Sequence, residues 1–186
     1  AARAVADPAF LAAKMGMDAD DPQLPQFQAQ LRAAMQRDQQ PQGAQGASLN
    51  IPPTLRPLIQ EITSLTQPQD MRHKIALLRE AIRRVEAGEG DRVLWASLTG
   101  ELGNTLCQNP SGDRAAELEA AIAAYQAALQ VYTRAAFPQD WATTQNNLGN
   151  AYANRILGEK AANVEDAIAA YQAALQVYTR AAFPQD

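Results

Sequence analysis

Few side chains could support catalysis in this 186-residue chain, which contains one cysteine, Cys107, and one histidine, His73. A cysteine nucleophile needs a base beside it, and these two residues are the only pair of that kind. No motif brings them together, and His73 lies between Arg72 and Lys74, where we expect it to be exposed. The sequence also lacks a glycine-rich phosphate loop, a serine elbow and the spacing of a metal site. We therefore expect a protein that is not an enzyme and that holds no metal and no cofactor.

A second set of polar side chains suits binding better than catalysis. In the stretch 141–156, four of them fall within about 60° of one another on a helical wheel: Thr143, Asn147, Asn150 and Asn154. The same positions 46 residues earlier hold Ser97, Glu101, Asn104 and Gln108. Helices placed side by side would therefore carry a ladder of amide groups, and an amide offers a hydrogen-bond donor and an acceptor together.

Two explanations of these polar positions stay open. They could be solvated helix positions with no role. However, each Asn in a helix costs several tenths of a kcal/mol relative to Ala, and that cost favours a use. We therefore predict that the eight positions form a partner-binding strip, with Asn104 and Asn150 as the strongest candidates.

The composition limits the class of protein and of partner. Ala and Gln are abundant and strand-favouring residues are sparse, so we expect an all-α protein. The net charge is −4 and the pI about 5.0, so no basic field attracts nucleic acid or an anionic membrane. No stretch approaches the roughly 18 consecutive apolar residues of a membrane span. We expect neither partner, and we place the protein in the cytoplasm.

Internal repeats organise the chain. The twenty residues AIAAYQAALQVYTRAAFPQD occupy 121–140 and occur again, unchanged, at 167–186. The 46-residue period extends upstream, where Trp95 corresponds to Trp141 and Leu102 to Leu148. A diverged third copy begins near 75. We predict units of about 52–90, 91–137 and 138–186 in an array covering 52–186.

Each unit reads as two helices. In the last unit we expect the first helix over 141–156, capped by Asp140 and burying Trp141, Leu148, Tyr152 and Ile156. The second is expected over 164–183, with Gly158 in the turn before it.

The first fifty residues differ from the array. Residues 1–36 contain a short amphipathic helix, with Leu24, Phe27, Leu31 and Met35 at helical spacing. A Gln/Gly-rich linker follows over 37–51. Because such a short helix is marginal alone, we expect it to dock, and one hypothesis places it in the groove of the array as a self-inhibitor.

At W-x(6)-L-G-x(2)-Y followed by A-x(3)-Y-x(2)-A, the sequence resembles the tetratricopeptide repeat (TPR) family. The matching residues in the last unit are Trp141, Leu148, Gly149, Tyr152, Ala167, Tyr171 and Ala174, and in the unit before it Trp95, Leu102, Gly103, Ala121, Tyr125 and Ala128. The 46-residue units of this chain are longer than the family's roughly 34 residues. In this they are similar to a long-helix bacterial variety found in large proteins with CHAT or nucleotide-switch modules.

The resemblance implies antiparallel helix-turn-helix repeats stacked as a right-handed α-solenoid, whose first helices line a concave groove. It also implies that the Asn after the Gly, here Asn104 and Asn150, contacts the backbone of a bound peptide. We therefore expect a protein–protein interaction scaffold that binds a protein or peptide. Two alternatives stay open: a self-associating array stacked end to end, and a regulatory segment of a larger bacterial effector such as a CHAT-type protease.

The second copy of the twenty residues lacks the polar outer face that a terminal repeat normally carries. We therefore expect either a longer array or another protein chain packed over the helix 167–183. If that chain were a second molecule of this protein, the result would be a homo-oligomer.

Overall fold

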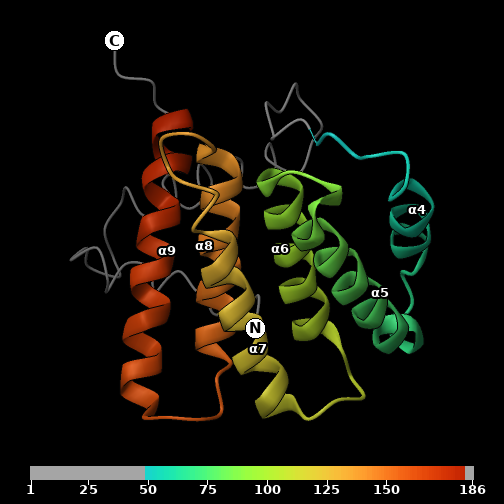
Figure 1. The fold of residues 1–186 in the computed structure, drawn as a ribbon. Coiled ribbons are helices and arrows are strands. Elements are labelled where there is room, and N and C mark those ends of the chain that lie inside the picture. The colour runs from blue at the N-terminus through green and yellow to red at the C-terminus, as the bar shows by residue number, and fades with distance from the viewer. Residues whose placement is uncertain (1–48, 183–186) are drawn as a thin grey trace. The chain divides into compact units, whose positions relative to one another are not determined.

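The computed structural model of the chain describes residues 49–182, with side chains as far as Tyr178. Every regular element in this range is a helix, which confirms the all-α class for the described residues (Figure 1). In chain order the elements are α4 (Arg56–Ser64), η1 (Pro68–Asp70), α5 (Met71–Arg84), η2 (Val85–Glu89), α6 (Arg92–Gln108), α7 (Arg114–Ala128), α8 (Pro138–Ala153) and α9 (Lys160–Ala182). None of these helices is long and apolar enough to cross a membrane.

Gln45–Val177 form one compact unit, and the packing described below belongs to it. The predicted N-terminal segment 1–36, with Leu24, Phe27, Leu31 and Met35, lies outside the described residues, as does most of the predicted linker 37–51. Ile51, the last residue of that linker, is half-buried and packs against the cluster that contains Leu55 and Leu78. Packed structure therefore extends into the end of the predicted linker.

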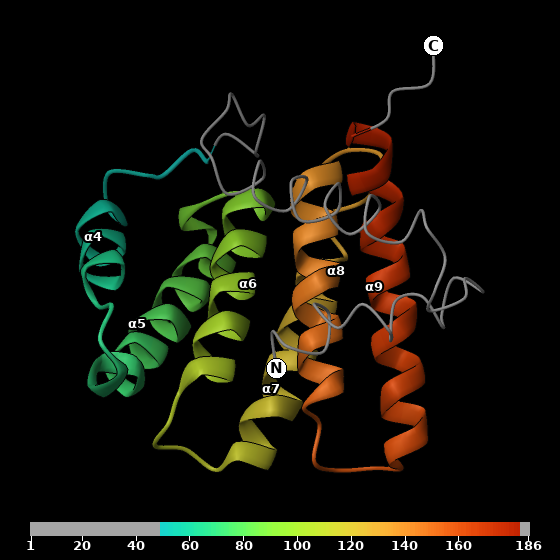
Figure 2. The same cartoon turned by 180° about the vertical axis from the view of Figure 1, so that it is seen from behind.

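Successive helices are neighbours in space. Contacts join α4 to α5, α5 to α6, α6 to α7 and α7 to α8, and α6 also touches α8 (Figures 1 and 2). Short connections over 109–113 and 154–159 lead from α6 to α7 and from α8 to α9, so each of these pairs folds back on itself.

The starts of the helices follow from capping residues and prolines. Asp91 caps α6 by accepting a 2.8 Å hydrogen bond from the backbone N–H of Leu94, and Asp113 caps α7 through the N–H groups of Ala115 and Ala116. The start of α8 differs from the prediction. Pro138 is already its first residue, so Asp140 lies inside the first turn and is not the cap. A proline suits the first helical position because its missing N–H would have no partner there.

The end of α8 also differs from the sequence prediction. The helix stops at Ala153, three residues before the predicted Ile156. Leu148 is buried as expected, but Ile156 lies in the connection and its side chain is 60% exposed. The predicted buried stripe is therefore wrong at this end, because the chain leaves the helix before Ile156 reaches the core.

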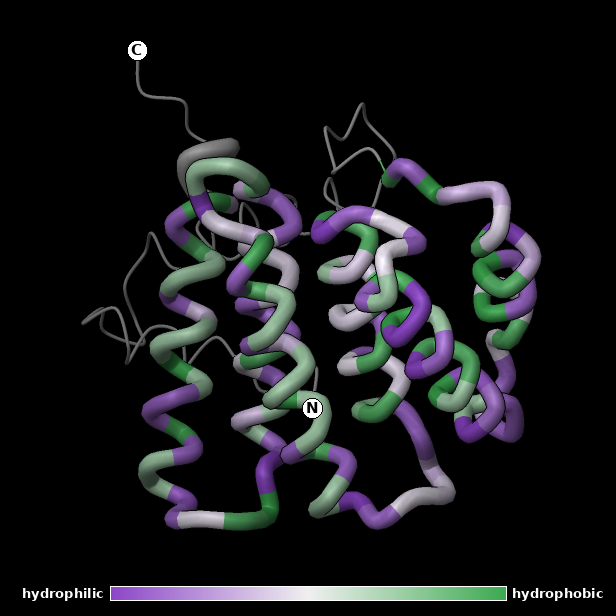
Figure 3. The backbone as a smooth tube through the Cα atoms, in the orientation of Figure 1, coloured by the Kyte–Doolittle hydropathy of each residue, from purple (hydrophilic) through white to green (hydrophobic). Residues whose placement is uncertain are grey.

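Buried apolar side chains fill the space between neighbouring helices. One cluster contains Ala121, Tyr125 and Leu148, and another contains Leu55 and Leu78. Figure 3 shows hydrophobic and hydrophilic residues alternating along α5, as expected for a helix with one buried face.

The two copies of the repeated twenty residues adopt different secondary structures. In the first copy, α7 ends at Ala128 and a series of turns leads to Pro138. Within these turns Tyr132 is 6% exposed, and its ring meets that of Phe137 edge to face at 5.7 Å. In the second copy the helix continues to Ala182. The second helix of the earlier unit is therefore shorter than its sequence period suggests.

Candidate binding groove

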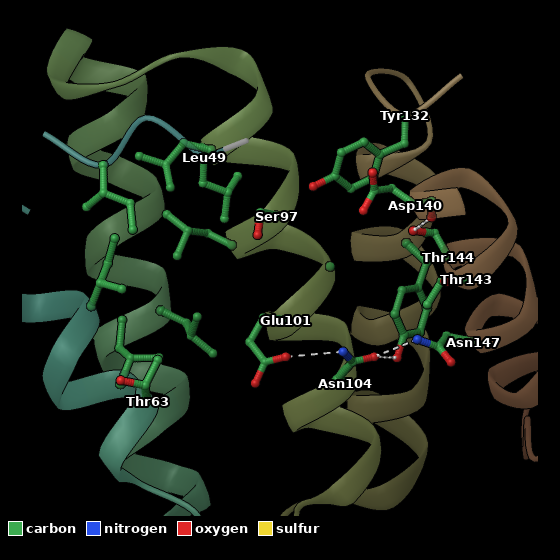
Figure 4. Close-up of a pocket in the computed structure, with 18 residues that line it drawn as sticks. Leu49, Thr63, Ser97, Glu101, Asn104, Tyr132, Asp140, Thr143, Thr144 and Asn147 are labelled. Carbon is green, nitrogen blue, oxygen red and sulfur yellow. Dashed lines mark hydrogen bonds between the residues drawn. The ribbon is translucent and has the colours of Figure 1, made fainter. Parts of the chain in front are cut away.

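A groove of about 350 Å³ opens on unit 45–177, between the side of α6 and the helices on either side of it. One wall is aliphatic and comes from residues 49–51, α4, α5 and α6: Leu49, Ile51, Ile59, Ile62, Leu78, Leu94 and Leu98. The other wall is polar and comes from α6, α8 and the turns before α8. Its residues are Ser97, Glu101, Asn104, Tyr132, Asp140, Thr143, Thr144 and Asn147 (Figure 4). Among the described residues, no Lys, Arg or His lines the groove.

Five of the eight predicted partner-binding residues line this groove: Ser97, Glu101, Asn104, Thr143 and Asn147. The other three do not. Gln108 is exposed at the end of α6, and Asn154 donates to the backbone oxygen of Asn150 over 2.7 Å. Asn150 is half-buried against α9, where its side-chain oxygen accepts from the Tyr171 hydroxyl at 2.8 Å. The structure therefore brings together three of the four predicted positions on α6 and the first two on α8.

The amide of Asn104 lies at the centre of a hydrogen-bond network. Its oxygen accepts from the Tyr125 hydroxyl at 2.9 Å and from Nδ2 of Asn147 at 3.0 Å. Its nitrogen donates to Glu101 at 3.2 Å, and Glu101 forms a 2.6 Å ion pair with Lys74 on α5. The bond between Asn147 and Asn104 shows that amide groups of neighbouring first helices do meet. It also uses both acceptor sites of the Asn104 oxygen.

Asn147 keeps more capacity for a ligand than Asn104. An amide side chain has two N–H donors and an oxygen acceptor. In the described contacts, one N–H of Asn147 is used for Asn104. Figure 4 shows Asn147 on the polar wall, between Thr143 and the amide of Asn104. Asn147 is therefore better placed than Asn104 to contact a bound backbone.

Tyrosines that the sequence reasoning treated only as repeat residues complete the site. Tyr125 lies under Asn104, and burial raises the pKa of its phenol, so it stays a proton donor to the amide. At the other end of the groove, burial also raises the pKa of Tyr132. The charge of Asp140 adds to this effect, while a hydrogen bond with Ser97 opposes it. The spacing from Asn104 to Tyr125 is 21 residues and recurs from Asn150 to Tyr171, a signal that could have revealed the pairing.

The structure gives Cys107 and His73 separate partners. His73 contacts Glu61 on α4 at 3.1 Å, and both side chains are more than half exposed. The Cys107 sulfur lies 3.9 Å from the Tyr125 hydroxyl. Burial raises the pKa of this thiol, which disfavours the thiolate that a nucleophile needs. Within residues 49–182, no group of three His, Cys, Asp or Glu side chains could hold a metal ion.

Comparison of the chain with protein-family models, with curated protein sequences and with solved structures found no match.

Proposed function

We propose that the groove binds an extended peptide segment of a protein partner, and that the chain acts as a non-catalytic scaffold. The observation that carries this proposal is the pairing of two unlike walls. Aliphatic side chains of the peptide fit against the accessible part of the aliphatic wall, at Leu49, Ile51 and Ile59, while its backbone meets the hydroxyl and amide groups opposite. A volume of about 350 Å³ is within the range of sites that bind small ligands or a few side chains.

The helix pairs support the same proposal at the level of architecture. Pairs that fold back on themselves, with α6 touching α8, are consistent with a right-handed TPR-like solenoid. In such an array the first helix of each pair lines the concave side. The groove lies along α6 and α8, the first helices of two successive pairs.

Selection from a phage-displayed library of random peptides about nine residues long tests the proposal. We expect enriched sequences that combine aliphatic residues with a polar edge. Thr143→Trp should abolish their binding, because residue 143 is exposed at the polar wall and the indole would fill the groove. Ala76→Trp, at an exposed position of α5 outside the groove, is the matched control and should bind normally.

A second variant tests the amide itself. Asn147→Ala should weaken the selected peptides by several-fold, because one net hydrogen bond contributes about 1 kcal/mol. Asn104→Ala is a poorer test, since it would remove the oxygen acceptor of the Tyr125 hydroxyl, leave it only the Cys107 sulfur, and disturb the fold. A library that yields no binders, or binders indifferent to Thr143→Trp, would rule out the groove as the binding site.

A further inference from the structure

Several side chains of the repeated segment are buried on α7 but exposed or half-buried on α9. Ile122 and Tyr125 are 5% and 2% exposed, whereas their copies Ile168 and Tyr171 are only half-buried. At the start of the same face Leu118 is 1% exposed, and Val164 at the corresponding position on α9 is 39% exposed. Because the two segments have the same sequence from 121 and from 167 onward, the difference comes from what packs on them.

Both α6 and α8 pack on α7, and α8 covers the face whose counterpart on α9 is exposed. Leu148 and Ala151 of α8 share a buried cluster with Ile122. The hydroxyl of Tyr152 accepts a hydrogen bond from Gln126 at 2.8 Å. Just beyond the end of α8, Arg155 forms two hydrogen bonds of 2.6 and 2.7 Å with the carboxylate of Glu119, which also lower the pKa of that carboxyl.

α9 offers the same chemical groups a second time. Glu165 and Gln172 occupy the positions that correspond to Glu119 and Gln126, and both are exposed. Together with Ile168 and Val164 they form a face that we call the α9 face. It presents a carboxylate, an amide and an aliphatic patch in the arrangement that binds α8 one unit earlier.

The pattern that fits this face is Leu-x(3)-Tyr-x(2)-Arg, as in Leu148, Tyr152 and Arg155. This pattern occurs once in the sequence, and α8 already contacts α7 with it. The corresponding residues one unit earlier are Leu102 and Leu106 of α6 and Asn109 just after it, which provide no Arg for Glu165. A second copy of the chain therefore has no unoccupied helix of this kind among its described residues.

We propose that the α9 face is a docking surface for a helix carrying Leu-x(3)-Tyr-x(2)-Arg, supplied by a further unit of the same 46-residue repeat. The Arg pairs with Glu165, the Tyr hydroxyl accepts from Gln172, and the Leu packs on Ile168. This surface is separate from the groove and does not depend on the peptide-binding function.

The test uses the full chain and a fluorescein-labelled peptide with the sequence of residues 138–156. A hydrocarbon link between the positions of Thr143 and Asn147, on the groove side, holds the peptide helical. We expect saturable binding by fluorescence anisotropy. Glu165→Arg should weaken it about tenfold, and a peptide with Arg155→Glu should restore binding to the Glu165→Arg chain, because the charges are then exchanged.

Controls separate this surface from the others. Glu80→Arg makes the same charge change at a carboxylate on α5 and should leave binding unchanged, as should Thr143→Trp in the groove. Circular dichroism of Glu165→Arg should match the parent chain. Absence of binding, or equal binding by the Glu165→Arg chain, would overturn the proposal. So would sedimentation showing a dimer that Glu165→Arg dissociates, since a second copy would then occupy the face.

Discussion

Three residues recur as a set in two successive helix pairs: a Gly, the Asn that follows it, and a Tyr on the next helix. In the first pair they are Gly103, Asn104 and Tyr125. The Tyr ring lies so close to the Gly that a Cβ there would be 2.7 Å from a ring carbon. The absence of a side chain at Gly103 thus allows the Tyr hydroxyl to reach the Asn oxygen. Helix packing and amide orientation are set by the same three residues.

Gly103→Ala should therefore lower the free energy of unfolding by about 1–3 kcal/mol, because the added methyl must displace the Tyr125 ring. Gly100→Ala is the control in the same helix, where a Cβ would meet nothing within 4 Å. That variant should be neutral or more stable by up to about 1 kcal/mol, since Ala favours helix over Gly. Urea denaturation measures both. Equal effects of the two substitutions would contradict the close-packing explanation.

Asn104 shows how far residue-level reasoning from the sequence could go. The helical spacing placed Asn104 and Asn147 on the facing sides of two helices, and they do form a hydrogen bond. What the helical spacing within α6 and α8 could not show is that Tyr125 of α7 uses the same oxygen, because that contact depends on the close approach of a third helix. The residue with the strongest family-based expectation is therefore largely engaged within the fold.

At the scale of elements, the end of a helix depends on what packs beside it. The residues after Ala128 and those after Ala174 are the same as far as the end of the sequence, yet only the second set continues the helix. Local preference permits both outcomes. Packing of Tyr132 in the cluster with Ala96 accompanies the turn in the first copy. A single sequence pattern could predict helix pairs, but it could not predict two different ends for identical residues.

Hydrogen exchange of residues 121–128 and 167–174, followed by NMR, tests the effect of this packing. The two segments have the same sequence, so their intrinsic exchange rates match apart from the first residue. We expect the amides of Ile122 and Tyr125 to exchange about tenfold or more slowly than those of Ile168 and Tyr171, because α8 covers α7. Equal protection in the two segments would show that the cover on α7 adds no local stability.

At the scale of the whole described unit, the groove combines parts that the sequence predicts unequally well. Its polar wall follows from the 46-residue register, which aligns Ser97 of α6 with Thr143 of α8 and Glu101 with Asn147. Its aliphatic wall includes Leu49, Ile59 and Ile62, which precede the clear repeats. No period relates these residues to the groove, so only the folded chain reveals them.

Three tyrosines, two of them buried and Tyr171 half-buried, predict how the stability of the whole unit depends on pH. Burial raises the pKa of Tyr125, Tyr132 and Tyr171 above that of an unfolded tyrosine, which is about 10. These phenols make their full contribution to the free energy of unfolding below about pH 10. The contribution is lost as the pH rises above that value, because the phenols then release their protons more readily in the unfolded chain than in the folded one. Urea denaturation at a series of alkaline pH values should show this fall. The Tyr125→Phe variant should lose stability less steeply, and an equal slope would contradict the assignment.

The identity of residues 121–128 and 167–174 also affects how the chain finds its fold. During folding, the surface of α6 that receives α7 could equally receive the same residues of α9. The correct pairing closes a connection over 109–113, whereas the wrong one closes 109–159. A tenfold longer loop costs about 2 kcal/mol more in closure entropy. Short connections therefore favour the correct pairing where the side chains of the two segments cannot distinguish it. The kinetic trap that we expect is a species in which α9 packs on α6 in place of α7.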